Sequence, residues 1–212
     1  MTKRLQTILN HLICCKRFAD VGCDHGYVAR AMLETGKAER VIVSDISAPS
    51  LKKAQTLLEP YGQRVKAVVC DGLALVDDDC DQVLIAGMGG EEIISILSSS
   101  HFLPQRLVLQ PMKNADKLRK SLLSCGYRII KDYIFRDDKF YVLIVAERGE
   151  DSYSEDEIFF GRDNLLSPTA DFLEFAKREH EKYCTLATSE GLSDATRAEL
   201  ITLKNKYAKV LK

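Results

Sequence analysis

Short apolar runs recur along the first half of the chain, roughly every 20–25 residues, with amphipathic segments between them. Each run is almost continuously apolar, which is typical of a parallel strand that is buried on both faces of a sheet. The segments between the runs place apolar residues three and four positions apart, which predicts helices that cover such a sheet. The expected strands are 18–21, 41–44, 65–70, 82–86 and 106–110, and the expected helices are 5–12, 27–33, 49–58, 91–97 and 115–123.

The pattern changes after residue 127. Two extended runs follow, separated by "RDDK" at residues 136–139, and little helical period remains. Polar residues of this kind between two extended runs indicate a hairpin-like turn. We therefore predict an α/β fold whose sheet is mostly parallel and has an antiparallel final strand.

Residues 153–212 contain two amphipathic segments and form, in our interpretation, a second domain after a sheet domain at residues 1–152. Ser167 and Pro168 predict the start of a helix, with serine as the N-cap and proline at the first helical position. The stretch "SEGLSD" then breaks the helix, so we expect an antiparallel α-helical hairpin. The apolar stripes are Phe172, Ala176, Tyr183 and Ala187 in the first helix and Leu200, Leu203, Tyr207 and Leu211 in the second.

Composition narrows the class of protein. The 212 residues carry a formal net charge of −1, so a nucleic-acid partner would need a local basic patch. No apolar run is long enough to cross a bilayer and no signal-peptide pattern is present, so we expect a cytoplasmic protein without membrane contact. The seven cysteines form no C-x-x-C pair, so we expect neither disulfides nor a metal site, and most cysteines as small core side chains.

Unusual residues follow four successive strands, where an open α/β sheet binds its ligand. Each group alone has an ordinary explanation as a glycine-rich loop, a helix cap or a turn. Together, on successive strand ends, they predict a cofactor site. The candidates are Asp20, Gly22, Asp24, His25 and Gly26 after the first strand, Asp45 and Ile46 after the second, Asp71 and Gly72 after the third, and Ala86, Gly87, Met88 and Gly89 after the fourth.

The acidity of the first loop decides which cofactor fits. A pyrophosphate prefers free backbone N–H groups without carboxylates nearby, so Asp20 and Asp24 disfavour NAD and FAD. S-adenosylmethionine has an ammonium and a sulfonium and no phosphate, and carboxylates can pair with its ammonium. We expect Asp45 to accept from both ribose hydroxyls and Asp71 to accept from the exocyclic amine of adenine.

Several motifs resemble those of the bacterial tRNA (adenine-22-N1)-methyltransferase family, whose members depend on S-adenosylmethionine. They are "KRLQTI", "ADVGCDHGY", "SDIS", "CDGL", "IAGMGGEEI", "LVLQPMKN", "YVLIVAERG" and "FGRDNLL", and with the terminal hairpin they cover nearly the whole chain. Two departures occur. Ala29 stands where the family often has proline, and Met112 and Lys113 separate Asn114 from the Gln-Pro pair that asparagine often follows directly.

The resemblance implies a Rossmann-like methyltransferase domain, tRNA as the partner, a hairpin that holds the tRNA, and N1-methyladenosine as the product. No protein partner is implied, so we expect a monomer. The N1 lone pair can attack a sulfonium methyl without prior deprotonation, so Cys23 is not needed as a nucleophile. The base must be unpaired or flipped out, and a nearby carboxylate or carbonyl would stabilise the cationic product.

Two loops are the expected acceptor side. The glycines around Met88 let the backbone approach the base, and Met88 either packs on the ring or fills the core. Amides after the fifth strand suit an adenine edge, or else form only a turn and a helix cap. His25 either orients its loop, touches substrate or begins a helix. The candidates for the transfer step are Asp24, Gly87, Met88, Gly89, Gln110, Pro111 and Asn114.

Other functions remain open at the level of sequence. The same cofactor loops would serve a methyltransferase that acts on another RNA or on a small molecule. A catalytically silent RNA-binding module is a different class, which the four intact loop aspartates disfavour. The last helix is basic, with no acid between Lys204 and Lys212, which favours contact with phosphates over a merely solvated face.

Overall fold

The computed structural model describes residues 1–77 and 79–212 and contains a seven-stranded sheet in the order β3-β2-β1-β4-β5-β7-β6. The first five strands are parallel, as predicted, and β7 is antiparallel to both of its neighbours. The final strand therefore lies inside the sheet and β6 forms its edge. The strands are β1 Cys15–Val21, β2 Ala38–Asp45, β3 Val65–Val69, β4 Gln82–Met88, β5 Arg106–Pro111, β6 Tyr127–Arg136 and β7 Phe140–Arg148.

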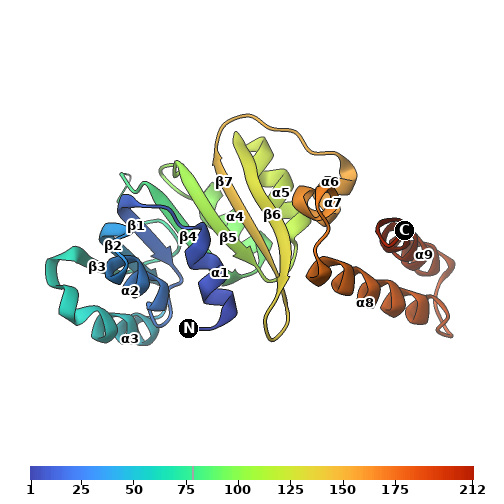
Figure 1. The fold of residues 1–212 in the computed structure, drawn as a ribbon, viewed down its shortest axis with the longest axis horizontal. Helices are drawn as coiled ribbons and strands as arrows, with labels where there is room; N and C mark the ends of the chain where they lie inside the picture. The colour runs from blue at the N-terminus through green and yellow to red at the C-terminus, as the bar shows by residue number, and fades with distance from the viewer. Residues whose placement is uncertain (78) are drawn as a thin grey trace.

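Helices cover both faces of the sheet, which confirms the layered α/β fold (Figure 1). Alternate strand residues divide between two cores: Phe18 packs with the first three helices, while Ala19 packs on the opposite side. This division is the physical reason why the strands read as continuous apolar runs. The helices are α1 Lys3–His11, α2 Tyr27–Glu34, α3 Ala48–Leu58, α4 Gly90–Ser98 and α5 Ala115–Ser124, with a short 3-10 segment η1 at Glu59–Arg64.

The strand order reverses beside β1. The chain adds β2 and β3 on one side of β1 and then returns to place β4 on the other side. Neighbouring connections therefore leave in opposite directions and open a crevice at the carboxyl ends of β1 and β4. The loops that carry the candidate residues meet at this crevice.

The helical hairpin is confirmed, but its beginning differs from the prediction. Two short helices precede it, and the Oγ1 of Thr169 accepts a hydrogen bond from the N–H of Phe172 at 3.2 Å. Thr169 is thus the N-cap that we had assigned to Ser167, which instead ends the preceding helix. The C-terminal helices are α6 Glu155–Phe160, α7 Arg162–Leu166, α8 Ala170–Ala187 and α9 Asp194–Val210.

The C-terminal segment seals the edge of the sheet. Three outward-facing N–H groups of β6 donate to side-chain oxygens of this segment: Asp132 to Asp163 at 3.0 Å, Ile134 to Asn164 at 3.0 Å, and Arg136 to Asp171 at 2.9 Å. An edge strand with satisfied N–H groups offers little to a second strand. α8 and α9 then project away from the sheet (Figure 1). The domain boundary near residue 152 stays a prediction.

A buried ion pair joins α5, β6 and α6. Arg119 and Asp132 are 2% and 1% exposed, and the guanidinium binds both carboxylate oxygens at 2.7 and 2.8 Å. Its third nitrogen donates to the carbonyls of Ile158 and Phe159. Burial raises the pKa of Asp132, and the guanidinium opposes this. Gly161 has a φ of +89°, and a Cβ there would lie 2.7 Å from the Asp132 carboxylate, which explains the glycine of "FGRDNLL".

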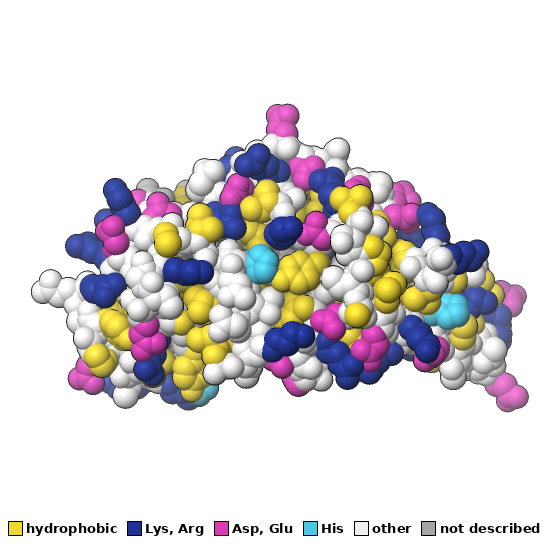
Figure 2. Space-filling view, in the orientation of Figure 1, with side chains coloured by type: hydrophobic (Ala, Val, Ile, Leu, Met, Phe, Trp, Pro, Cys, Tyr) yellow, Lys and Arg dark blue, Asp and Glu magenta, His cyan; other side chains and the backbone are white. Residues whose placement is uncertain are grey.

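Cysteine burial corrects one expectation. All seven cysteines are free, but only Cys70 and Cys80 are buried, so most are not core side chains. Nowhere among the described helices is there an apolar stretch long enough to cross a lipid bilayer. Figure 2 shows acidic and basic side chains interspersed over one face rather than a field of a single sign.

Replacing Arg119 by Met should lower the free energy of unfolding by about 3–5 kcal/mol, because Asp132 would remain buried without its cation. Urea unfolding followed by circular dichroism measures this loss. Lys117→Met is the matched control on the same helix, since Lys117 pairs with Glu91 at the exposed surface and its loss should change stability little. Equal effects of the two substitutions would show that the buried pair is not an anchor.

Candidate active site

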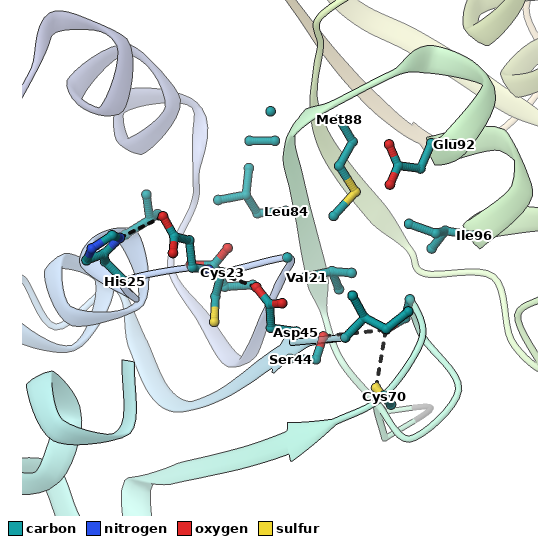
Figure 3. A pocket seen from close by; sticks show the side chains of 18 of the residues that line it. Val21, Cys23, His25, Ser44, Asp45, Cys70, Leu84, Met88, Glu92 and Ile96 are labelled. Atoms are coloured by element: carbon teal, nitrogen blue, oxygen red, sulfur yellow. Dashed lines mark hydrogen bonds and ion pairs between the residues drawn. The ribbon is translucent and has the colours of Figure 1, made fainter. Parts of the chain in front are cut away.

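A cavity of about 780 Å³ lies at the crevice and brings the four predicted loops together. α1 and α4 complete its walls, and Figure 3 shows Asp45 and Cys23 across from Met88 and Glu92. Gly26 is outside the cavity; it caps α2 with a φ of +71° and lies against Ala54. The predicted residues in the lining are Asp20, Gly22, Asp24, His25, Asp45, Ile46, Asp71, Gly72, Ala86, Gly87 and Met88.

Three successive backbone N–H groups of the loop after β1 are bonded to the end of β2. Those of Gly22 and Cys23 both donate to the carbonyl oxygen of Ser44, at 2.8 and 3.1 Å. The N–H of Asp24 donates to Oδ2 of Asp45 at 3.2 Å. A phosphate-binding loop needs such groups free and pointing at the ligand. The hydrogen bonding therefore disfavours a pyrophosphate independently of the loop's acidity.

Asp45 ties the first two loops together. Its Oδ1 accepts from the N–H of Ser47 at 2.8 Å, and its Oδ2 accepts from Asp24. Each oxygen retains a further lone pair, so the fixed carboxylate can accept from a vicinal diol. Ile46 beside it is 73% exposed and gives the cavity an apolar edge suited to a planar ring.

Asp20 and Asp24 have different environments. Asp20 is 6% exposed, and burial raises its pKa to about 7, with a smaller contribution from Asp45. No ion-pair partner of Asp20 occurs among the described residues. Asp24 lies at the rim with a φ of +47°, bound to Nδ1 of His25 at 2.7 Å and to Lys53 at 3.5 Å. A backbone hydrogen bond from Ala29 partly opposes the effect of burial on Asp20. Asp20 is thus the deep carboxyl without an ion-pair partner among the described residues, which makes it the better partner for a buried cation.

Glycines let the loops close on one another. A Cβ on Gly22 would lie 2.1 Å from Cε of Met88, and one on Gly72 would lie 2.7 Å from Ile96. Both have positive φ. Met88 packs partly against the core on the α4 side and also reaches across to the first loop. Both of our interpretations of Met88 are therefore still compatible with its position.

Two helices contribute lining residues that the sequence analysis missed. α1 supplies Arg4, and α4 supplies Glu92, whose carboxylate accepts from the N–H of Gly89 at 3.3 Å. Glu92 stands three residues after Gly89, a spacing typical of helix capping that would have located it near the loop. Arg4 belongs to the "KRLQTI" motif, but no local pattern places the first helix over the carboxyl ends of the strands.

The candidates after β5 lie outside this cavity. Gln110 is completely buried, with Oε1 accepting from Nε of Arg4 at 2.6 Å and Nε2 donating to the Pro111 carbonyl at 3.2 Å. Pro111 and Asn114 instead line a second cavity of about 540 Å³, together with aromatic residues of α8 and α9. Asn114 precedes α5 with a φ of +56° and makes no side-chain cap.

The two cavities share a wall of two hydrogen-bonded loops. The N–H of Met112 donates to the carbonyl of Met88 at 2.8 Å, and that of Gly90 donates to Lys113 at 2.8 Å. Gly89 lies in this wall, where a Cβ would be 3.1 Å from Cε of Lys113. The structure therefore brings the cofactor candidates together and places the candidates after β5 on the far side of this wall.

The donor set fits S-adenosylmethionine. The deep carboxyl of Asp20 can face an ammonium, Asp45 can accept from a ribose diol, and Ile46 and Asp71 border the space for a base. Within residues 1–77 and 79–212 no group of three or more His, Cys, Asp or Glu side chains is arranged to hold a metal ion.

Comparisons with known proteins agree with this geometry. Residues 1–144 match the family model described as a methyltransferase domain. The chain is 30% identical over 175 residues to the tRNA (adenine(22)-N(1))-methyltransferase of Bacillus subtilis, covering 79% of this chain and 74% of that protein. A Streptococcus pneumoniae structure named "a putative tRNA (m1A22) methyltransferase", in complex with S-adenosyl-L-methionine, is 25% identical with a TM-score of 0.91 and complete coverage of both chains.

A third comparison supports the fold alone. The Bacillus subtilis m1A22 tRNA methyltransferase structure has a TM-score of 0.89 at 24% identity, covering 100% of this chain and 99% of that one. The similarity thus includes the C-terminal hairpin as well as the sheet. The chain belongs to the methyltransferase-domain family and, within it, to the family of tRNA (adenine(22)-N(1))-methyltransferases.

Proposed function

We propose that this protein transfers a methyl group from S-adenosylmethionine to N1 of adenine 22 in tRNA. The observation that carries the proposal is the acidic cavity at the strand-order reversal, whose first loop has the N–H groups of Gly22, Cys23 and Asp24 already bonded to the end of β2. The family of the chain supports the choice of acceptor. Acids without phosphate-binding amides match a cofactor with a cationic amino-acid end.

The first three loops would hold the cofactor. Asp20 faces the ammonium from the floor of the cavity, and Asp45 accepts from the ribose hydroxyls while keeping its two backbone hydrogen bonds. Ile46 covers one face of the adenine, and Asp71 accepts from its amine. S-adenosylmethionine supplies an electrophilic methyl group when bound.

The loop after β4 and the start of α4 would receive the target base. Gly87 leaves room for the base, with Met88 beside it. The Glu92 carboxylate, which accepts from the N–H of Gly89, is available to stabilise the positive charge that develops on the ring. No general base is required, because N1 has a free lone pair. Burial and the acids nearby raise the pKa of the Cys23 thiol far above its usual range, so Cys23 stays protonated and does not act as a nucleophile.

The C-terminal hairpin would hold the tRNA. The second cavity lies at the junction of the sheet and the hairpin, with Tyr183 and Phe175 among its aromatic lining and Lys113 and Lys182 among its cations. Such a surface suits unstacked bases and phosphates of an RNA. We further infer that the enzyme acts as a monomer, because the C-terminal segment already covers the edge of β6. A tRNA substrate would place the enzyme in the cytoplasm.

Incubation with unmodified tRNA transcripts and the methyl donor should give N1-methyladenosine at position 22, mapped by nuclease digestion and mass spectrometry. A transcript with guanine at position 22 should remain unmodified. Asp45→Ala is the control enzyme; loss of a charged acceptor should weaken cofactor binding by about 1–3 kcal/mol. Transfer only to another RNA or to a small molecule would indicate a methyltransferase with a different acceptor. Cofactor binding without any transfer would indicate a catalytically silent RNA-binding module.

Asp20 should make the stability of the free protein depend on pH. Its folded pKa of about 7 lies above the ordinary value of 3.8, so the folded state keeps a proton that the unfolded chain has released. Stability from this group is therefore lost as pH rises toward 7. Asn does not titrate, so the stability of Asp20→Asn relative to wild type should increase between about pH 4 and pH 7, by at most about 1.4 kcal/mol per pH unit, and level off above pH 7.

Urea unfolding at each pH measures this difference. Cofactor binding should have the opposite preference, because an ammonium favours the ionised carboxylate. The affinity for S-adenosylhomocysteine should thus rise with pH in wild type and stay flat in Asp20→Asn. A constant stability difference between the two proteins would show that Asp20 does not titrate in this range.

Charge reversal on α9 should weaken tRNA binding and leave the cofactor site unaffected. Lys209 pairs with Asp156 at 2.5 Å, so Lys204 and Lys206 are the better probes. Lys204→Glu with Lys206→Glu should lower tRNA affinity and reduce the salt dependence by about one ion for each lost phosphate contact. Filter binding at several salt concentrations measures both quantities. Unchanged tRNA affinity in a protein of normal thermal stability would assign the hairpin a structural role.

A further inference from the structure

We propose that Arg4 binds the carboxylate of the cofactor's amino-acid end and that Gln110 positions Arg4 for this contact. The inference deepens the proposed function, because it depends on S-adenosylmethionine as the ligand of the first cavity. It assigns a binding role to the first helix, which lies outside the loops that bear the other candidates.

The charge of the cavity is strongly one-sided. Arg4 is the only Lys or Arg among the described residues that line it, against five carboxylates. The amino-acid end of the cofactor carries an ammonium and a carboxylate side by side. Acids in the first loop suit the ammonium, but they repel the carboxylate, which therefore needs a cation. The five acids of the lining are Asp20, Asp24, Asp45, Asp71 and Glu92.

The guanidinium of Arg4 has no anionic partner in the part of the chain that the structure describes. Its Nε donates to the neutral amide oxygen of Gln110 at 2.6 Å, and its Cζ lies 5.2 Å from the ring centroid of Tyr141. Asp137 is close, but its carboxylate accepts from the backbone N–H of Arg4 at 2.8 Å. A half-buried cation without a counter-charge is costly, and a carboxylate ligand would compensate it.

The surroundings of Arg4 hold its guanidinium in place. Gln110 is completely buried, and its Nε2 donates to the Pro111 carbonyl, so its Oε1 is directed at Arg4. Gly87, at the end of β4, has a φ of +87°, and a Cβ there would lie 3.1 Å from Nη2 of Arg4. The guanidinium thus reaches the cavity wall beside a glycine, with its Nη groups available to a ligand.

A phosphate of the bound tRNA has the same anionic chemistry as the cofactor carboxylate. We favour the carboxylate because Arg4 lines the cofactor cavity itself, together with Asp20 and Gly22. The two sources differ in a way that binding experiments without RNA can separate.

Isothermal titration calorimetry with two ligands tests the proposal. S-adenosylhomocysteine carries the carboxylate, and S-adenosyl-3-thiopropylamine lacks only that group. Arg4→Gln should bind S-adenosylhomocysteine about 10–100-fold more weakly than wild type, because a charge-assisted pair is lost, and should bind the amine within about threefold of wild type. Arg4→Lys should recover part of the loss. Lys3→Gln is the matched control, since Lys3 pairs with Asp171 at 3.6 Å and lies outside the cavity lining.

Gln110→Leu tests the positioning role. It should lower the preference for S-adenosylhomocysteine over the amine by about 3–10-fold with Arg4 still present. A purely structural contribution of Gln110 would weaken both ligands equally and leave their ratio unchanged. Thermal unfolding of each variant confirms that the comparison concerns folded protein.

Equal weakening of both ligands in Arg4→Gln would overturn the proposal and make Arg4 a support of the cavity. Unchanged binding of both ligands with a raised KM for tRNA would also overturn it and assign Arg4 to a phosphate. These titrations contain no tRNA, so their outcome is separate from that of the methylation assay. If Arg4→Gln lost binding of the carboxylate ligand selectively and the wild-type enzyme did not methylate adenine 22, the role of Arg4 would be upheld and the proposed acceptor refuted.

Discussion

The hydrogen bonds that join the first loop to the end of β2 determine what the cavity can bind. The carbonyl of Ser44 and the carboxylate of Asp45 together take the N–H groups of Gly22, Cys23 and Asp24. The loop keeps the tight glycine turn of a dinucleotide fold, but these three N–H groups are not free to bind an anion. Its carboxylates then dominate the electrostatics. A ligand with a cationic end and a diol fits this chemistry, and a pyrophosphate does not.

The C-terminal segment belongs energetically to the sheet even though it projects away from it. Side chains between Asp163 and Asp171 satisfy the outer N–H groups of β6, and the Arg119–Asp132 pair reaches from α5 to the carbonyls of α6. Removing the whole segment would expose these groups as well as the apolar surface of Ile134. Charge reversal on α9 is therefore a cleaner probe of tRNA binding than truncation.

The errors of the sequence analysis have physical causes. Ser167 and Thr169 are both good caps, so local sequence does not choose between them; in the structure Thr169 caps the helix whose Phe172 is buried in the aromatic cluster. α6 and α7 have five or six residues each and no apolar period to read, although Ser154 and Glu157 form a recognisable capping box. Most cysteines are not core side chains, because position in the fold rather than residue type sets their exposure.

The sequence by itself determined the strands, the order of the loops and the acids within them, because these depend on local periodicity and on the rule that ligands bind at the carboxyl ends of parallel strands. It also supplied the family, through motifs spread over nearly the whole chain. Only the tertiary structure decided which residues share a cavity. Arg4 and Gln110 are 106 positions apart and meet because α1 packs across the sheet, while the wall between Met88 and Met112 separates Asn114 from the cofactor loops. Such contacts are set by the packing of distant elements, and no local pattern encodes them.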